Sequence, residues 1–146
     1  MSVVVPQELA NVLPINRKLR LAVEIFAVYG RVRWYLWRGR ELGEILSSLR
    51  ESDRIRRDEA PGLTEQRAGF RLGEIVGRTL GVLPADSRCL VRSLVLTALL
   101  ARRGIASSLV IGVKAGPDFA AHAWVETAGR PLLQPAEWLY SRLVEL

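Results

Sequence analysis

The spacing of apolar residues constrains the fold most, because it changes in character near residue 84. Before that point, apolar residues recur every three or four positions, which is typical of helices that bury one face. After it, one strongly apolar helix precedes short apolar segments that turn residues separate. The sequence therefore predicts an α+β fold in which helices come first and a small antiparallel sheet follows.

Three helices are predicted in the first half of the chain. The longest spans Ile15–Arg38 and follows Pro14, which we expect to separate it from a short helix near the N-terminus. Its predicted inward positions are Leu19, Val23, Phe26 and Tyr29. The second helix spans Glu41–Arg57, and the third spans Glu65–Leu80 with Thr64 as its cap.

A buried helix and a small sheet are predicted in the second half. The expected order is a helix over Arg88–Arg103, strands over Ser107–Val113, Ala121–Glu126 and Pro131–Leu133, and a closing helix over Glu137–Leu143. Ala128 and Gly129 are a hairpin signal between the last two strands. The 146 residues fit a single domain at 1–146, with a helical N-terminal region at 1–83 and a core at 84–146.

Composition excludes several classes of protein. Apolar residues make up 49% of the chain and charged residues 25%, which indicates a globular rather than a disordered protein. A single cysteine allows no internal disulfide and indicates a reduced, intracellular setting. The N-terminus lacks the pattern of a signal peptide, and charges interrupt the longest apolar stretch, so we expect no membrane-spanning helix.

Basic residues gather in the longest predicted helix. Residues 17–40 hold seven arginine or lysine side chains against Glu24 alone, and the whole chain has a net charge of +6. Such a charge favours an acidic peptide, a nucleic acid or a membrane surface as partner. We predict that an aromatic–basic cluster binds substrate or partner: Arg31, Arg33, Trp34 and Trp37, with Tyr35 and Arg38. The alternative is an ordinary amphipathic helix whose aromatic side chains face the core.

Cys89 and His122 are the chain's one cysteine and one histidine. Cys89 lies in the first turn of its predicted helix, where unpaired N–H groups and the helix dipole favour a thiolate and an oxyanion. His122 begins a strand that this helix can pack against, so the two fit the roles of nucleophile and general base. The alternative is that both are structural, since cysteine is often a small buried hydrophobe.

Other kinds of site find little support in the sequence. Two potential ligands are too few for a structural zinc site, so we expect no metal. The chain has no Gly-rich phosphate loop and no Gly-x-Ser-x-Gly elbow, and we expect no cofactor. No nucleic-acid recognition motif is present.

Several segments together resemble a known family. They are the helix from Cys89 to the corner at Arg102-Arg103-Gly104, the strand ending in Ile111-Gly112-Val113, and the strand His122-Ala123-Trp124-Val125-Glu126. In this order they resemble the transglutaminase-like leader peptidases of lasso-peptide biosynthesis, most strongly over residues 86–133. The chain's length is similar to the stand-alone peptidase half of the lasso-peptide B protein. The resemblance implies a papain/transglutaminase-like catalytic core at 84–146.

The resemblance also implies an activity and partners. Cys89 would attack a carbonyl at the end of the leader of a ribosomally made lasso-peptide precursor, with His122 as base. A leader-binding recognition protein would present this precursor, and a cyclase similar to asparagine synthetase would then close the macrolactam with ATP. The implied protein is a bacterial, cytoplasmic thiol protease of antibiotic (RiPP) biosynthesis that binds no nucleic acid and does not insert stably into a membrane.

The third catalytic position departs from the family's pattern. The family places an aspartate about a dozen residues after the histidine, where this chain has Gln134. An amide can orient an imidazole but cannot supply the full charge stabilisation. Asp118 is the reserve candidate, and Asp86 is better suited to cap a helix.

Two further residues are candidates for substrate or partner binding. Trp124 alternates with His122, so both side chains should share one face of the strand, with Trp124 as a wall of the cleft or as part of the core. Arg92 follows Cys89 by one helical turn and either contacts substrate or an acidic partner, or is an ordinary solvated side chain.

Three other functions stay open at this point. The first is a non-catalytic transglutaminase-like scaffold that holds the precursor or the cyclase. The second is a basic protein that binds nucleic acid or a membrane surface. The third is an enzyme that transfers amides between protein side chains with the same Cys–His chemistry.

Overall fold

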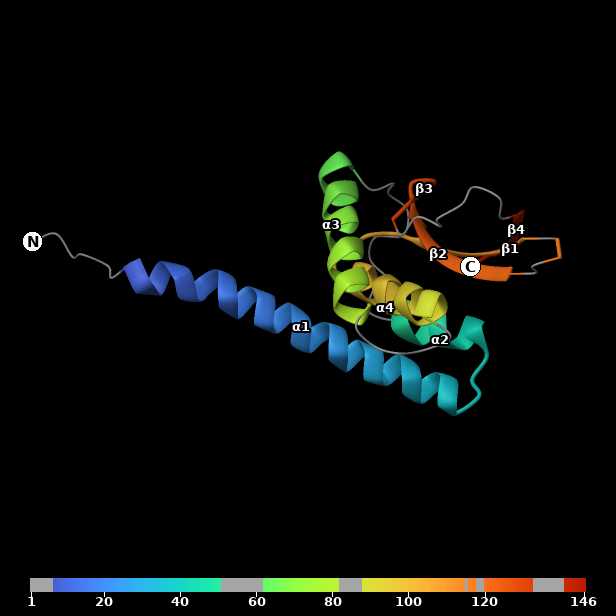
Figure 1. The fold of residues 1–146 in the computed structure, drawn as a ribbon, viewed down its shortest axis with the longest axis horizontal. Coiled ribbons are helices and arrows are strands. Elements are labelled where there is room, and N and C mark those ends of the chain that lie inside the picture. Colours follow the sequence, from blue (N-terminus) through green and yellow to red (C-terminus); the bar gives the residue numbers. More distant parts are fainter. Residues whose placement is uncertain (1–6, 51–61, 82–87, 115, 118–119, 133–140) are drawn as a thin grey trace, which may run out of the picture.

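The computed structural model describes residues 7–50, 62–81, 88–114, 116–117, 120–132 and 141–146. These residues form four helices and a four-stranded antiparallel sheet (Figure 1). The helices are α1 (Gln7–Trp37), α2 (Leu42–Arg50), α3 (Leu63–Leu80) and α4 (Arg88–Arg102). The strands are β1 (Ser108–Lys114), β2 (Ala120–Thr127), β3 (Arg130–Pro131) and β4 (Ser141–Glu145). The predicted α+β class is confirmed.

Helix α4 is the centre of the fold, because α1, α2, α3 and the strands β1 and β2 all pack against it (Figure 1). Its core-forming residues are wholly buried: Leu94, Val95, Leu96, Leu99 and Leu100. Gly104, with a φ of 68°, takes the left-handed conformation that commonly follows a helix end. The predicted helix is therefore confirmed to within one residue, and it fixes where its first turn meets the sheet.

Helix α1 differs from the prediction in the face that it buries. Ile25, Val28 and Val32 form its buried side, whereas the predicted inward residues Leu19, Val23 and Phe26 are exposed. Tyr29, the fourth predicted inward residue, does pack against the core. The prediction was wrong because α1 carries apolar residues on two opposite sides, and periodicity alone cannot tell which side is covered.

The helix also continues through Pro14, where a break was predicted. Proline has a φ near −65°, which fits a helix, and its cost is the loss of one backbone hydrogen bond and a local clash. No helix in the described part of the chain combines the length and the apolar character that crossing a membrane requires.

Helices α2 and α3 follow the predicted patterns in part. Ile45, Leu46 and Leu49 of α2 are buried, and the predicted extension of α2 beyond residue 50 lies outside the described residues. Helix α3 begins after Gly62 and has no side-chain cap. Thr64 is therefore inside the first turn rather than before it, and the predicted cap was wrong.

The sheet has the order β3-β2-β1-β4. The two central strands match the predicted strands to within one residue at each end. Ala128 and Gly129 both have a positive φ, at 50° and 75°, which is the geometry of a tight hairpin turn, and this confirms the predicted hairpin. After that turn, β3 is short, and among the described strands it pairs only with the end of β2.

Strand β4 replaces part of the predicted closing helix. Ser141–Glu145 pairs antiparallel with β1, so the prediction was wrong for residues 141–143, and residues 137–140 lie outside the described residues. All five side chains of β4 are exposed, so burial does not place this strand. The position of β4 is instead fixed by backbone hydrogen bonds. These extend to Leu109 and Leu146, where the N–H of each residue donates to the C=O of the other, at 2.7 and 2.8 Å.

Candidate active site

Cys89 is the second residue of α4, within the first turn of that helix, as predicted. Its side chain is half-buried and packs against the hydrophobic core. The first N–H groups of a helix have no acceptor within the helix. A negatively charged sulfur, or the oxyanion of a substrate bound beside it, would therefore lie where the helix favours negative charge.

His122 lies on β2, opposite Gly112 of β1, and is half-buried. Burial lowers the pKa of its imidazole below the ordinary 6.5, because desolvation disfavours the charged ring. The neutral ring is the form that can accept a proton from a thiol. The environment of His122 therefore suits a general base near neutral pH.

A buried hydrogen bond joins the helix of Cys89 to the strand of His122. The Ser93 hydroxyl donates to the backbone carbonyl of Ala123 at 3.1 Å. Ser93 lies one helical turn after Cys89 on the same face of α4, and Ala123 directly follows His122. This bond therefore holds the first turns of α4 against the part of β2 that carries the histidine.

In the part of the chain that the structure describes, no strand pairs with this edge of β2 at Ala123. Strand β3 pairs with β2 only at Glu126 and Thr127, and Leu132 donates its backbone N–H to the carbonyl of Val125 at 2.8 Å. Carbonyls two residues apart on a strand point to the same edge. The carbonyl of Ala123 therefore emerges on the same edge, beyond the end of β3, where the serine of α4 meets it.

Trp124 shares a face of the sheet with His122, as predicted. The two rings lie 6.1 Å apart between centroids at an interplanar angle of 20°, and Trp124 is buried. A Cβ added at Gly112 would lie 2.7 Å from the Trp124 ring, so the indole covers this glycine directly. Gly112 therefore leaves the space that Trp124 needs beside the histidine.

Glu126 and Arg142 extend this row of side chains. The buried carboxylate of Glu126 accepts hydrogen bonds from Trp124 Nε1 at 2.9 Å and from Arg142 Nη2 at 2.7 and 2.9 Å. Sequence reasoning missed this role for both residues. The alternation of His122, Trp124 and Glu126 could have indicated it, but Arg142 was assigned to a helix and so was not placed on the sheet.

Arg92 lies one turn after Cys89 but extends towards the end of α3. One of its terminal nitrogens lies 3.5 Å from where a Cβ at Gly81 would be. The carboxyl end of a helix attracts a cation. Its Nε is buried and has no hydrogen-bond partner among the residues that the structure describes.

The predicted aromatic–basic cluster lies on and next to α1, whereas Cys89 and His122 lie on α4 and β2. Arg31 Nε donates to the Tyr35 hydroxyl at 2.9 Å, and the rings of Trp34 and Trp37 lie 5.4 Å apart. Both tryptophans are exposed, so the alternative that these side chains fill the core is wrong for them. Arg33 is exposed as well.

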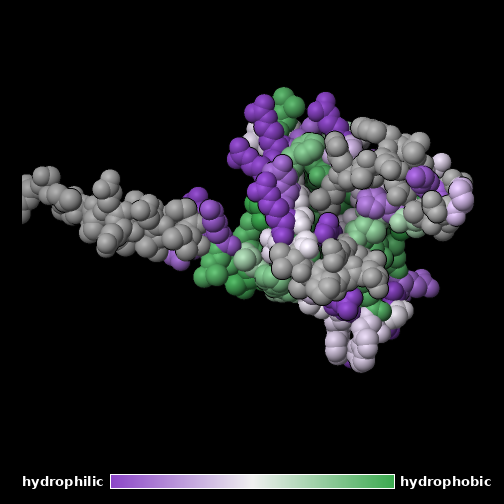
Figure 2. Space-filling model, viewed as in Figure 1, coloured by the Kyte–Doolittle hydropathy of each residue, from purple (hydrophilic) through white to green (hydrophobic). Residues whose placement is uncertain are grey.

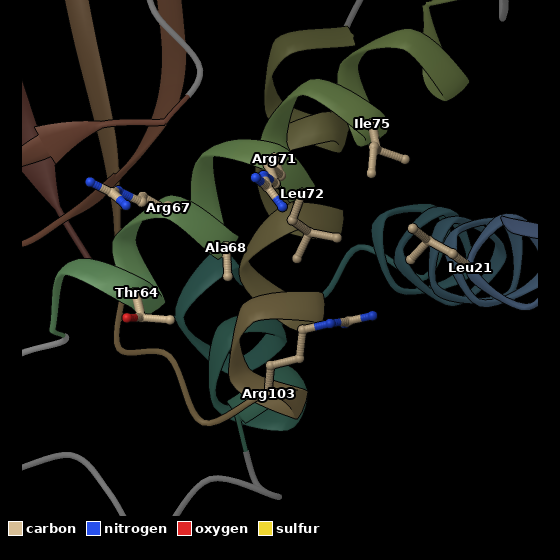
Figure 3. Close-up of a pocket in the computed structure, with 8 residues that line it drawn as sticks. All are labelled: Leu21, Thr64, Arg67, Ala68, Arg71, Leu72, Ile75 and Arg103. Atoms are coloured by element: carbon tan, nitrogen blue, oxygen red, sulfur yellow. The ribbon is translucent and has the colours of Figure 1, made fainter. Parts of the chain in front are cut away.

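A cavity of about 480 Å³ lies between α1, α3 and the end of α4 (Figure 3). Among the described residues, its lining includes the three cations Arg67, Arg71 and Arg103 and no acidic side chain. Arg103 directly follows α4, whereas Cys89 opens that helix, so the two ends are about 20 Å apart. The cavity is therefore separate from the region of Cys89.

Three residues considered for the site lie outside the described residues: Gln134, Asp118 and Asp86. The choice of Gln134 or Asp118 as the group that orients His122 stays a prediction. Among the residues that the structure describes, no three histidine, cysteine or acidic side chains gather in a way that could hold a metal ion.

The comparison with known families places the chain. A family model, described as the transglutaminase-like superfamily, matches residues 26–143. The chain belongs to the transglutaminase-like superfamily. No curated protein and no solved structure matches it.

Membership of the transglutaminase-like superfamily agrees with the observed fold, in which a buried helix packs on an antiparallel sheet. The superfamily includes cysteine proteases, and the matched range contains Cys89 and His122. A peptidase-like activity that uses a cysteine is therefore the class of function that the family supports.

Proposed function

We propose that this protein is a cysteine peptidase that removes the leader peptide from a ribosomally made lasso-peptide precursor. The hydrogen bond between Ser93 and Ala123 carries the proposal, because it joins the helix of the proposed nucleophile to the strand of the proposed base. The substrate class rests on the resemblance of the segments around Cys89 and His122 to lasso-peptide leader peptidases. A cyclase similar to asparagine synthetase would act on the released core peptide.

In the proposed reaction, His122 takes the proton of the Cys89 thiol, and the sulfur attacks the carbonyl carbon at the end of the leader. Backbone N–H groups in the first turn of α4 stabilise the oxyanion. His122 then gives its proton to the leaving amine, which becomes the new amino terminus of the core peptide. Water hydrolyses the thioester that holds the leader and restores the thiol.

The position of the imidazole depends on its neighbours in this proposal. Gln134, or Asp118 in reserve, would orient the ring by accepting a hydrogen bond from it. Trp124 would support the ring from the side, and Glu126 fixes Trp124 through the indole nitrogen. Glu126 is thus a positioning residue that acts through Trp124.

A cleavage assay tests the proposal directly. The purified protein is incubated with a leader-bearing lasso precursor, with and without the leader-binding protein, and the products are identified by mass spectrometry. We expect free leader and free core peptide whose masses together equal the mass of the precursor plus one water. A protein that binds the precursor but never cleaves it would be a scaffold, and crosslinked side chains would indicate amide transfer.

The pH dependence of cleavage should report the lowered pKa of His122. Because the neutral ring is the base, kcat/KM should fall only as the pH drops below 6.5. Stability should fall in the same window, since the unfolded chain binds more protons there than the folded one. Proton NMR of the single histidine measures this pKa without overlap. A folded-state pKa at or above 6.5 would contradict the expectation.

A further inference from the structure

An apolar stripe runs along the side of α1 that faces away from the rest of the protein. Five of its side chains are 48–78% exposed: Leu19, Val23, Phe26, Trp34 and Trp37. With Gly30 they follow one another at intervals of four, three, four, four and three residues, which places all six on one face of a helix. We call this face the outer stripe. Figure 2 shows apolar surface where α1 meets the rest of the molecule.

The outer stripe is the second apolar face of α1. Ile25, Val28 and Val32 form the first face, which is buried against the rest of the protein. At about 100° per residue, the centres of the two faces lie nearly opposite each other around the helix. Monomeric proteins seldom expose apolar side chains in such a continuous row, and a row of this kind marks an interaction site.

Cations border the outer stripe. Arg20, Arg31 and Arg38 follow one edge in helical projection, and the guanidinium of Arg38 stacks over the Trp34 ring at 4.7 Å. Glu24 is the one acidic residue between positions 16 and 37. Its carboxylate forms an ion pair with Arg103, which directly follows α4, at 3.1 Å. The charge beside the outer stripe is therefore positive, and its complement is acidic.

Gly30 lies in the middle of the outer stripe, and a Cβ added there would meet nothing within 4 Å. Glycine within a helix costs about 0.5–1 kcal/mol relative to alanine, and no packing within the described chain requires it here. Because Gly30 has no side chain, it leaves a gap between Phe26 and Trp34 on this face, which we call the notch. A side chain from a second helix would fill such a notch as a knob fills a hole.

We propose that the outer stripe of α1 binds an acidic amphipathic helix of a partner protein. Residues 19–37 span about 27 Å, enough for a partner helix of about five turns. A second copy of this chain is disfavoured as the occupant, because it would set arginine against arginine. A lipid surface would use the apolar and basic residues but has no use for the notch at Gly30. The proposal does not depend on the peptidase activity.

Binding of a designed peptide tests the proposal with the full chain. The probe is a fluorescein-labelled peptide of four heptads with leucine at a and d and glutamate at e and g, where mutual repulsion keeps the free peptide monomeric. We expect saturable binding by fluorescence anisotropy, at least about tenfold tighter than for the same peptide with lysine at e and g. Phe26→Glu should weaken binding about tenfold or more.

Two variants separate binding from folding. Gly30→Leu fills the notch, so it should weaken binding while Tm stays equal or rises, because leucine favours a helix more than glycine does. Leu63→Glu changes a side chain that is 70% exposed at the start of α3, away from the outer stripe, and should leave binding unchanged.

Three results would overturn the proposal. They are the absence of saturable binding by the acidic peptide, equal affinity for the acidic and basic peptides, and unchanged binding by the Phe26→Glu variant. Vesicles of phosphatidylserine and phosphatidylcholine form a separate arm. Vesicle binding that Phe26→Glu abolishes, without any binding of the acidic peptide, would assign the outer stripe to a membrane surface instead.

Discussion

Replacing Cys89 by alanine should abolish release of the leader while the protein stays folded and still binds the precursor. The sulfur is the atom that forms the thioester, and no other thiol exists in the chain to replace it. Removing the nucleophile of a comparable catalytic group lowers kcat by a factor of about 10⁴ or more. Single-turnover cleavage, followed by mass spectrometry at saturating precursor, measures the loss.

Two controls separate lost chemistry from lost structure. Cys89 is half-buried and packs on the core, so a control that keeps most of its side-chain volume is needed, and Cys89→Ser is that control. We expect it to be as poorly active as the alanine variant. Circular dichroism should show the same fold and a Tm within a few degrees for both variants. Cleavage by Cys89→Ala at more than about a hundredth of the wild-type rate would end the assignment of Cys89 as nucleophile.

The elements that carry the candidate pair were predictable, because each has an unambiguous local pattern. Helix α4 is apolar on almost every side, and such a helix has to be buried. Strands β1 and β2 are apolar segments with turn residues between them and after β2. The first-turn position of Cys89 and the shared face of His122 and Trp124 follow from those patterns alone.

The parts that were mispredicted depend on distant segments. The side of α1 that is buried is decided by what packs against it, and both of its apolar faces have the same helical period. Strand β4 is fixed by pairing with β1 and by the contact of Arg142 with Glu126, while its own side chains are all exposed. The local sequence therefore determines neither which face of α1 is buried nor that residues 141–145 form a strand.

Gly112→Val should destabilise the fold and displace the tryptophan beside the candidate base. A Cβ at this position would lie 2.7 Å from Cη2 and Cζ3 of Trp124 and 3.1 Å from the backbone oxygen of Ser141, so either the indole or β4 has to move. Overpacking of this kind costs about 1–3 kcal/mol. Urea unfolding should show a lower midpoint, and kcat should fall because the ring that stacks on His122 has shifted.

A second substitution tests the cause of that loss. Trp124→Leu in the Gly112→Val background makes room for the new side chain, so the double variant should lose less stability than the two single effects add up to. Gly43→Ala is the matched control, since an added Cβ there meets nothing within 4 Å and the helix should gain up to about 1 kcal/mol. Additive losses for Gly112→Val and Trp124→Leu would mean that the two residues are not in contact. The indole could then not be the support that links Glu126 to the imidazole.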